Sequence, residues 1–200
     1  VSSPSHVTGV EAVDSDRWEL QLADGVDVDP TGFQRNFYST SSCGVCGKAS
    51  IDAIRVAGVR PVAGPVVDAE VLLGLPGRLR AEQALFDSTG GLHAAALFDA
   101  DGALSDVRED VGRHNAVDKV VGAATAREWP IPPSGLMVSG RISFEIVQKA
   151  AVAGIGLVCG VSAASSLAVD LAEEFGMTLV GFLRDPGFTL YAGAERIAGL

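Results

Sequence analysis

Leu92-His93-Ala94-Ala95-Ala96-Leu97-Phe98 is the stretch that decides the fold. Six of its seven residues are apolar, which is typical of a strand covered on both faces of a sheet. The pair Asp101-Gly102 follows shortly and is typical of a hairpin turn, so we expect Leu104 to Val107 to return beside the first strand. An antiparallel strand pair is therefore predicted at the start of the main sheet.

Downstream of this hairpin, short apolar runs alternate with helical periodicity. Gly135 to Val138, Ile155 to Cys159 and Thr178 to Leu183 are each expected to form a buried strand. Apolar residues three and four apart lie between these runs and predict amphipathic helices. The pattern predicts an α/β fold of three layers, α/β/α, around a mixed sheet. The helical stripes are Ala116, Val117, Val120, Val121 and Ala124; Ile142, Ile146, Val147, Ala150 and Ala151; and Leu167, Ala168, Leu171, Ala172 and Phe175.

The residues before the hairpin form a different pattern. From Val7 to Phe37 the runs are short and alternating, with apolar residues on one face between Trp18 and Leu22 and a turn pattern at Asp24-Gly25. We therefore expect a small β region over residues 1–40 and an α/β domain over residues 41–200. Because the sequence does not begin with Met, we expect the β region to be the remnant of a longer N-terminal segment.

Two apolar segments carry internal interruptions. The stretch from Asp68 to Asp87 has helical periodicity but is expected to be divided at Leu75-Pro76-Gly77, because proline lacks an amide hydrogen and clashes with the preceding turn. Ala150 to Val169 contains no charged residue and is long enough to cross a membrane. Glycines and serines punctuate it, so we expect a helix end, a strand and a helix start there, and no membrane span.

The composition narrows the range of partners. Fifteen Lys and Arg residues stand against 25 Asp and Glu residues, which gives a net charge of −10. This charge repels nucleic-acid phosphates and anionic membranes, so we expect no binding to nucleic acid or membrane. The three cysteines are an odd number and follow no secretion signal, so we expect a reducing, cytoplasmic location.

Two cysteines three residues apart offer the main chemistry, within Ser41-Ser42-Cys43-Gly44-Val45-Cys46-Gly47-Lys48. A helix that starts near Gly47 and the ammonium of Lys48 both favour the thiolate, which is the nucleophilic form. The spacing suits a redox disulfide, half of a metal site, or a persulfide carrier with a neighbouring thiol. Cys159 lies inside an apolar run and is expected to be a core residue.

A zinc site needs ligands beyond these two cysteines. The chain has three histidines and no second C-x-x-C. His93 begins a sequence comparable to the H-x-E element of zinc-dependent nucleoside deaminases, but Ala95 stands where the glutamate is needed. We therefore expect no bound zinc. His93 either lines a ligand cleft or is a hydrogen-bonded core histidine.

Three polar junctions between strands and helices are candidate ligand sites. The string R-E-D-V-G-R-H-N-A-V-D-K at 108–119 is one, although such runs also occur on solvated faces. The segments 139–145 and 160–166 place glycine and serine at expected helix starts, near Gly140 and Gly160, where backbone amides can bind phosphate. For the serines, helix capping is the alternative role. The candidate ligand residues of these junctions are Arg113, His114, Ser139, Gly140, Arg141 and Ser162.

A further candidate segment ends the last expected strand. Phe182-Leu183-Arg184-Asp185-Pro186-Gly187 combines an aromatic face, a guanidinium and a tight turn. Such a set can stack on a base and contact phosphate or carboxylate groups. The chain contains neither G-x-x-x-x-G-K-[ST] nor G-x-G-x-x-G, so the expected nucleotide cleft is not that of a P-loop enzyme or an ordinary dinucleotide dehydrogenase.

In their order along the chain and in their amino-acid sequences, these segments resemble the formate dehydrogenase accessory sulfurtransferase family, FdhD. The double-cysteine loop alone has low specificity, whereas the long polar string is highly specific. The matching segments are S-S-C-G-V-C-G-K at 41–48, G-G-L-H-A-A-A-L-F at 90–98, R-E-D-V-G-R-H-N-A-V-D-K-V at 108–120, S-G-R-I-S-F-E-I-V-Q-K-A at 139–150 and G-V-S-A-A-S-S-L-A at 160–168.

The resemblance implies a sulfurtransferase that accepts persulfide sulfur from a cysteine desulfurase. Such a protein passes the sulfur to the bis-guanine-dinucleotide molybdenum cofactor before that cofactor enters formate dehydrogenase. The resemblance also implies a cytidine-deaminase-like fold, a homodimer and, in relatives, an additional N-terminal β segment. By position, Cys43 matches the persulfide-bearing cysteine and Cys46 its partner. The residues that match the cofactor-binding segment are Phe182, Leu183, Arg184, Asp185, Pro186 and Gly187.

The thiol pair by itself leaves two other functions open. A thiol–disulfide oxidoreductase can use Cys43 and Cys46 as its redox pair. A noncatalytic chaperone of the molybdenum cofactor can use the same cysteines only to hold the metal centre. Loading of sulfur by a desulfurase separates the sulfurtransferase from both.

Overall fold

The computed structural model describes residues 3–15, 17–28 and 64–200, which fall into two compact units, Val1–Thr40 and Ser41–Leu200. In the first unit, a short 3-10 helix (η1, Pro4–His6) leads into strand β1 (Val7–Ala12), which pairs antiparallel with β2 (Trp18–Leu22). A turn follows at Asp24 and Gly25, where Gly25 adopts a φ of +80°. The predicted small β region is therefore a hairpin. Its expected extension to Phe37 lies outside the described residues.

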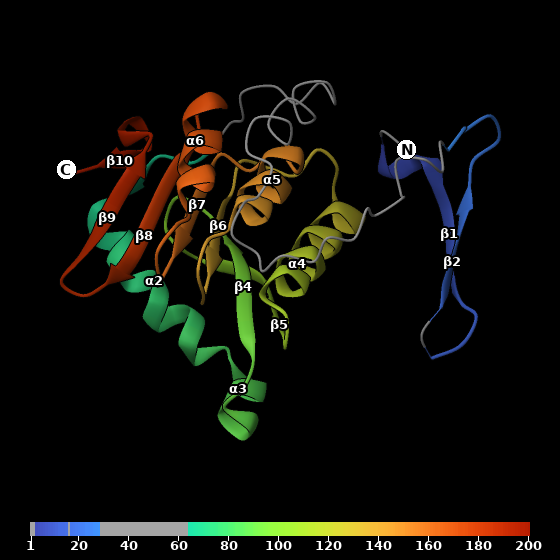
Figure 1. Cartoon of the computed structure of the whole chain (residues 1–200), viewed down its shortest axis with the longest axis horizontal. Helices are drawn as coiled ribbons and strands as arrows, with labels where there is room; N and C mark the ends of the chain where they lie inside the picture. Colours follow the sequence, from blue (N-terminus) through green and yellow to red (C-terminus); the bar gives the residue numbers. More distant parts are fainter. Residues whose placement is uncertain (1–2, 16, 29–63) are drawn as a thin grey trace. The chain divides into compact units, whose positions relative to one another are not determined.

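The second unit is built on a six-stranded mixed sheet with the order β5-β4-β6-β7-β8-β9 (Figure 1). The central strands β6, β7 and β8 are parallel, and β4 runs antiparallel to both of its neighbours. At the other edge, β9 returns antiparallel to β8. The strands are β4 (His93–Phe98), β5 (Leu104–Asp110), β6 (Gly135–Val138), β7 (Leu157–Gly160), β8 (Thr178–Arg184) and β9 (Gly187–Ala192).

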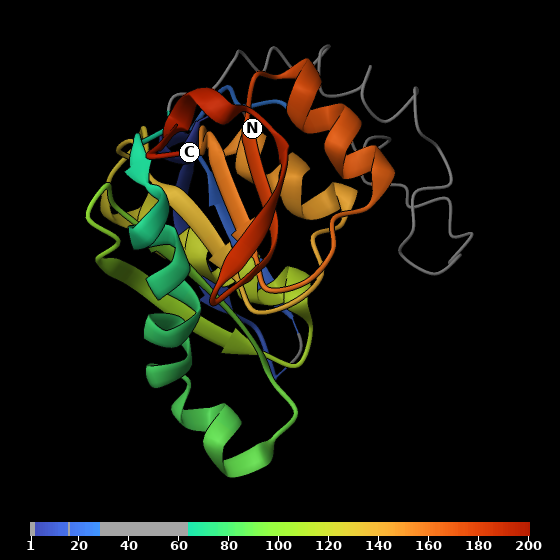
Figure 2. The ribbon, with the colours of Figure 1, turned by 90° about the vertical axis from the view of Figure 1, so that its left-hand side faces the viewer.

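Helices cover both faces of this sheet (Figure 1, Figure 2). One face packs against α4 (Arg113–Arg127), α5 (Phe144–Val152) and α6 (Ser166–Glu174), and the other against α2 (Ala69–Ala81). The alternation along β4 explains the two faces, because successive side chains of a strand point in opposite directions. Ala95 and Leu97 enter the first core, whereas Ala94, Ala96 and Phe98 enter the second.

Four short elements complete the described part of the second unit. Strand β3 (Val67–Asp68) precedes α2 and pairs in parallel with β10 (Ile197–Ala198), which follows a 3-10 helix (η3, Ala194–Arg196). Helix α3 (Ala84–Thr89) follows α2 after a short break. Asp68 caps α2, because its carboxylate accepts a hydrogen bond from the Glu70 amide at 2.9 Å.

The expected division of the helical stretch at Leu75-Pro76-Gly77 is wrong. Helix α2 runs without interruption through Pro76, and the break comes later, at Glu82 and Gln83. A proline inside a helix costs about 3 kcal/mol. Burial of Leu72, Leu75 and Leu79, each at most 1 % exposed, contributes about 1.5 to 3 kcal/mol per side chain and offsets that cost.

Other predicted boundaries also need correction. The strand expected over Leu104 to Val107 continues to Asp110, since β4 supplies pairing partners as far as His93. Ile142 was expected on a helical stripe but precedes α5 and forms an isolated bridge with Ala164. Strand β9 was not predicted at all.

Two expectations about apolar residues can be compared with the structure. Cys159 lies fully buried in β7, as predicted for a core residue, and burial raises the pKa of its thiol far above the usual range. Within residues 3–15, 17–28 and 64–200, no helix is long and apolar enough to cross a membrane.

Candidate functional site at the carboxyl edge of the sheet

The polar junctions predicted from the sequence meet at one edge of the sheet. Strands β5, β6, β7 and β8 run in the same direction, so their carboxyl ends lie at the same edge, together with the start of the antiparallel β4. His93 and Gly140 come close together there, because a Cβ atom placed on Gly140 would lie 3.2 Å from His93 Nδ1. The same Cβ position is 3.9 Å from Arg113 Cδ. Open α/β sheets bind their ligands at this edge.

Asp110 organises the entry into α4. Its Oδ1 accepts hydrogen bonds from the Gly112 amide at 2.8 Å and from Asn115 Nδ2 at 3.1 Å. Its Oδ2 forms an ion pair with Lys119 Nζ at 2.6 Å. The hydrogen bond from Lys119, followed by that from the Gly112 amide, lowers the pKa of Asp110. Asn115 therefore serves to hold this turn.

Other acidic groups of the same string join distant elements. Glu109 accepts hydrogen bonds from the backbone amides of Leu85 and Phe86, at 2.9 and 2.8 Å, and so caps the start of α3. Asp118 pairs with Lys149 and ties α4 to α5. The string 108–119 is thus largely a set of structural contacts.

Two residues of the string, Arg113 and His114, are not fully used in such structural contacts. His114 Nε2 and Ser143 Oγ share a hydrogen bond of 2.8 Å, and Glu145 Oε2 lies 3.8 Å from the same ring nitrogen. Desolvation, followed by the charge of Arg113, lowers the pKa of His114. Among the described residues, Arg113 Nε and Glu145 Oε2 are buried side-chain atoms without a hydrogen-bond partner. Buried polar atoms of this kind mark a place where a ligand can bind.

The helix starts expected at Gly140 and Gly160 are placed too early. Helix α5 begins at Phe144 after Ser143, and α6 begins at Ser166, where Ser165 Oγ accepts the Ala168 amide at 3.3 Å. The intervening loops are held extended, because Ile142 bridges to Ala164 and its amide donates to Ala163 O at 3.0 Å.

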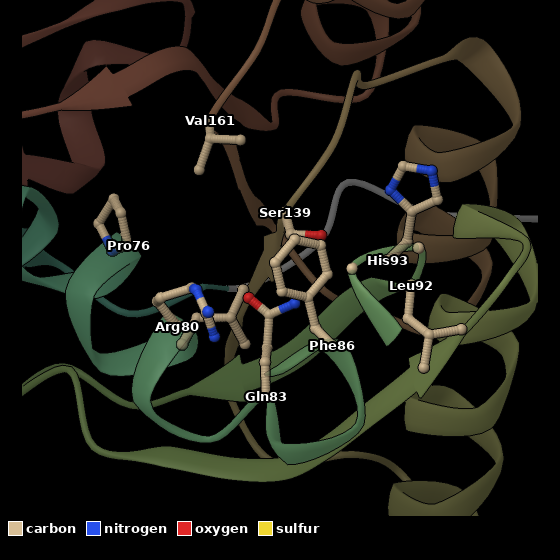
Figure 3. Close-up of a pocket in the computed structure, with 11 residues that line it drawn as sticks. Pro76, Arg80, Gln83, Phe86, Leu92, His93, Ser139 and Val161 are labelled. Carbon is tan, nitrogen blue, oxygen red and sulfur yellow. The ribbon is translucent and has the colours of Figure 1, made fainter. Parts of the chain in front are cut away.

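A cavity of about 500 Å³ opens beside these loops, on the face of the sheet that carries α2 (Figure 3). Ser139 lines it, and its Oγ accepts a hydrogen bond from the Ala94 amide at 2.8 Å. His93 also lines the cavity, as one of its two sequence interpretations predicted. The lining residues are Pro76, Leu79, Arg80, Gln83, Phe86, Gly90, Gly91, Leu92, His93, Ser139 and Val161.

The predicted segment from Phe182 to Gly187 forms the end of β8 and the turn into β9. Phe182 has a φ of +49°, is 41 % exposed and donates its amide to Ser162 O at 3.1 Å. Arg184, Asp185 and Pro186 are exposed. Leu183 needs correction as a ligand contact, because its side chain is completely buried in the core beneath β8 and can only support the segment.

The other predicted site residues have different positions. Arg141 is exposed in the loop before α5, and Ser162 lies half-buried after β7. Cys43 and Cys46 lie outside the described residues. Within the described ranges, no three His, Cys, Asp or Glu side chains are grouped to hold a metal ion. The expectation of no zinc stays a prediction for the whole chain.

The fold and this edge define an α/β protein with a cavity at the ends of its parallel strands. The FdhD/NarQ family model matches residues 1–198, so the chain belongs to the FdhD/NarQ family. The sequence resemblance to FdhD is thereby confirmed.

Relatives from distant organisms share most of the chain. It is 58 % identical to the sulfur carrier protein FdhD of Streptomyces coelicolor over 184 residues, which cover 90 % of this chain and 65 % of that protein. It is 45 % identical to the sulfur carrier protein FdhD of Thermoplasma acidophilum over 199 residues, or 98 % of this chain and 71 % of that protein. The chain thus spans about two thirds of the length of such relatives.

A solved structure has the same fold. The crystal structure of a candidate formate dehydrogenase accessory protein from Desulfotalea psychrophila superposes with a TM-score of 0.74. The comparison covers 98 % of this chain and 73 % of that protein, at 23 % identity. It supports the mixed α/β architecture described above.

Proposed function

We propose that this chain is a sulfur carrier that takes persulfide sulfur from a cysteine desulfurase and delivers it to the molybdenum cofactor of a formate dehydrogenase. Its kinship over 90 % of its length with proteins described as sulfur carrier protein FdhD carries the proposal. Cys43 and Cys46 supply two thiols three residues apart, as the chemistry requires.

Sulfur loading is the transfer of a persulfide's outer sulfur from one cysteine thiolate to another. The Cys43 thiolate attacks the outer sulfur of the desulfurase persulfide, and the desulfurase cysteine leaves as a thiolate. Cys43 then carries one additional sulfur atom, and no net oxidation has taken place. Activation of Cys43 rests on its thiolate fraction, which Lys48 favours.

Delivery uses the second thiol. The Cys46 thiolate attacks Cys43 Sγ, a Cys43–Cys46 disulfide forms, and the outer sulfur leaves as hydrosulfide that becomes a ligand of the metal. The two thiols supply the two electrons that the released sulfide carries. An external thiol reductant then returns the disulfide to the dithiol.

The cofactor is the substrate of this reaction, and its guanosine phosphates need a binding surface. We assign that surface to the exposed groups of Phe182 to Gly187, with Arg113, His114, Ser139, Gly140, Arg141 and Ser162 around the carboxyl edge. The unpaired Arg113 Nε supports this assignment, because it offers a buried donor to an anion. A cytoplasmic homodimer with a cytidine-deaminase-like fold completes the proposal.

Intact-mass spectrometry tests the function directly. The chain is incubated with a cysteine desulfurase and cysteine, and the expected result is a mass gain of one sulfur atom that a thiol reductant reverses. A chain that gains no sulfur and only cycles between dithiol and disulfide contradicts the proposal and indicates a thiol–disulfide oxidoreductase. A chain that binds the cofactor without either change indicates a noncatalytic chaperone.

A further inference from the structure

The two outer strands of the main sheet, β5 and β9, end the sheet in different ways. Among the described residues, β5 pairs only with β4, and β9 pairs only with β8. An edge strand presents unpaired backbone N–H and C=O groups, which can pair with a strand of another chain. Native proteins usually protect such an edge with charged side chains or a bulge. An edge without this protection is therefore a candidate interface.

The outer edge of β5 is protected by basic side chains and by a bulge. Arg108 donates from its guanidinium to Val107 O at 2.8 Å, and Lys119 Nζ donates to Glu109 O at 3.1 Å, so carbonyl groups of the strand are bound by side chains of the same chain. The register with β4 shifts beside Asp106, whose φ of +53° interrupts the regular strand. A second strand therefore cannot pair regularly with β5.

The outer edge of β9 lacks this protection. The strand, Gly-Phe-Thr-Leu-Tyr-Ala at 187–192, contains no charged residue. In the part of the chain that the structure describes, no side chain forms a hydrogen bond with the backbone of β9. Figure 2 faces this edge and shows β9 in front of the sheet, with α2 on one side and α6 on the other. The edge of β9 is therefore open to a further strand.

The backbone groups of Phe188 and Leu190 are the ones that point outward. The Phe182 amide donates toward the β7 side of the sheet, at 3.1 Å. Because backbone directions alternate along a strand, the preceding Gly181 points toward β9 and exchanges hydrogen bonds with Thr189, which lies opposite it. The neighbours of Thr189 on β9 therefore direct their N–H and C=O groups away from β8.

This pattern is self-complementary about Thr189. When two copies of β9 lie antiparallel across a two-fold axis, Phe188 of each copy can exchange both backbone hydrogen bonds with Leu190 of the other. Thr189 of one copy then lies directly opposite Thr189 of the other, in the pair of the ladder whose side chains are closest. The Thr189 side chain is exposed, and threonine pairs in this position stabilise a sheet.

We propose that β9 is a dimer interface and that β9 of a second copy of this chain pairs with it. The inference rests on the proposed function only in naming the interface of the homodimer included there. The pairing joins two six-stranded sheets into one sheet, and both outer strands of that sheet are β5. Because the β5 edge is protected, the assembly closes at the dimer and does not extend to larger oligomers.

Analytical ultracentrifugation and hydrogen–deuterium exchange of the unaltered chain test the interface. We expect a monomer–dimer equilibrium, with slower amide exchange at residues 187–192 in the dimer than in the monomer. Residues 104–110 of β5 are the matched control and should exchange equally in both. The net charge of −10 makes two copies repel each other, so dimerisation should strengthen as salt is added. A chain that stays monomeric, or a dimer that leaves exchange at 187–192 unchanged, overturns the proposal.

Charge variants at the two edges sharpen the test. Thr189→Lys places two ammonium groups opposite each other and should weaken dimerisation by about tenfold, although it lowers the overall repulsion between copies. Thr189→Val keeps an uncharged strand-forming residue and should dimerise like the unaltered chain. Ser105→Lys adds the same charge to an exposed residue of β5 and is the matched control. Equal dimerisation of Thr189→Lys and Ser105→Lys refutes the interface, and the exchange measurement decides if Thr189→Lys does not fold.

Sulfur loading, measured on the same preparation of the unaltered chain, separates this proposal from the proposed function. Loading by a chain that does not dimerise through β9 overturns the interface alone. Dimerisation through β9 without loading overturns the sulfur-carrier function and leaves the interface standing. If exchange at residues 187–192 slows only when a cysteine desulfurase is added, the edge binds a different protein and its assignment to a second copy is wrong.

Discussion

Residues 109–119 and residues 182–187 each include the end of a strand at the carboxyl edge of the sheet, yet they use their polar groups in opposite ways. In the first segment, Glu109 binds the start of α3 and Asp118 binds α5, while Asp110 is bound to other residues of the segment. In the second, Arg184 and Asp185 are exposed on a turn. A dense polar string can therefore position a site without contacting its ligand, whereas a short exposed turn remains available for binding.

This difference assigns a mainly structural role to the string at residues 108–119, the most specific motif in the sequence. Within the string, Arg113 Nε has no hydrogen-bond partner among the described residues and His114 bonds Ser143, whereas Glu109 holds the start of α3 and Asp118 ties α4 to α5. Variants in the string should therefore lower stability. Variants in the turn should lower affinity and leave stability unchanged.

The largest expected effect is on nucleotide affinity. Arg184→Ala removes one charge-assisted contact and should weaken GDP binding by roughly ten- to a hundredfold, with an unchanged melting temperature. Calorimetry with GDP and ADP measures it, and Arg17→Ala, an exposed arginine of the β1–β2 hairpin unit, is the control. Equal affinity for GDP and ADP, or no loss in Arg184→Ala, would show that the turn is not the nucleotide site.

The next effect is on stability. Asp110→Ala removes hydrogen bonds to Gly112 and Asn115 and the ion pair to Lys119, so the free energy of unfolding should fall by about 2 kcal/mol. Chemical denaturation gives the value, and replacement of the exposed Asp170 by alanine on α6 is the control. A chain that unfolds as before but loses GDP affinity would place Asp110 in the binding surface.

A smaller effect is expected on the free energy of unfolding at low pH. The folded-state pKa of Asp110 lies below its ordinary value of 3.8, so the carboxylate contributes stability above that pH and loses it as the pH falls through the lowered pKa. The folded-state pKa of His114 is also lowered, from 6.5, so its contribution is complete above that pH and declines below it.

Denaturation curves between pH 3 and pH 7 should therefore separate the two groups. Asp110→Asn should flatten the decline in stability below about pH 4, and His114→Gln the decline that starts below about pH 6.5. Unchanged slopes in both variants would mean that neither group is linked to folding.

Sequence periodicity was sufficient for most of the sheet. Gly135 to Val138 forms β6 with the predicted bounds, because a short apolar run covered on both faces has few other conformations open to it. Helix α2 shows where local rules fail, since the buried leucines on either side of Pro76 outweigh the helix-breaking proline. Strand β9 was missed because its residues form a strand by pairing with β8, and their own hydrophobic pattern does not indicate one.

The candidate site was only partly accessible to sequence reasoning. The edge itself was predicted, since strand-to-helix junctions meet there. The role of Glu109 was not, because it caps α3 through amides 23 and 24 residues earlier in the chain.

The most direct test of sulfur transport through Cys43 is the intact mass of three variants after incubation with a cysteine desulfurase and cysteine. Cys43→Ala should gain no sulfur, whereas Cys46→Ala should gain one atom that it cannot release by forming a disulfide. Cys159→Ala should load like the unaltered chain, because Cys159 is fully buried in β7. Full loading of Cys43→Ala with none on Cys46→Ala would contradict the account and reverse the roles of the two thiols.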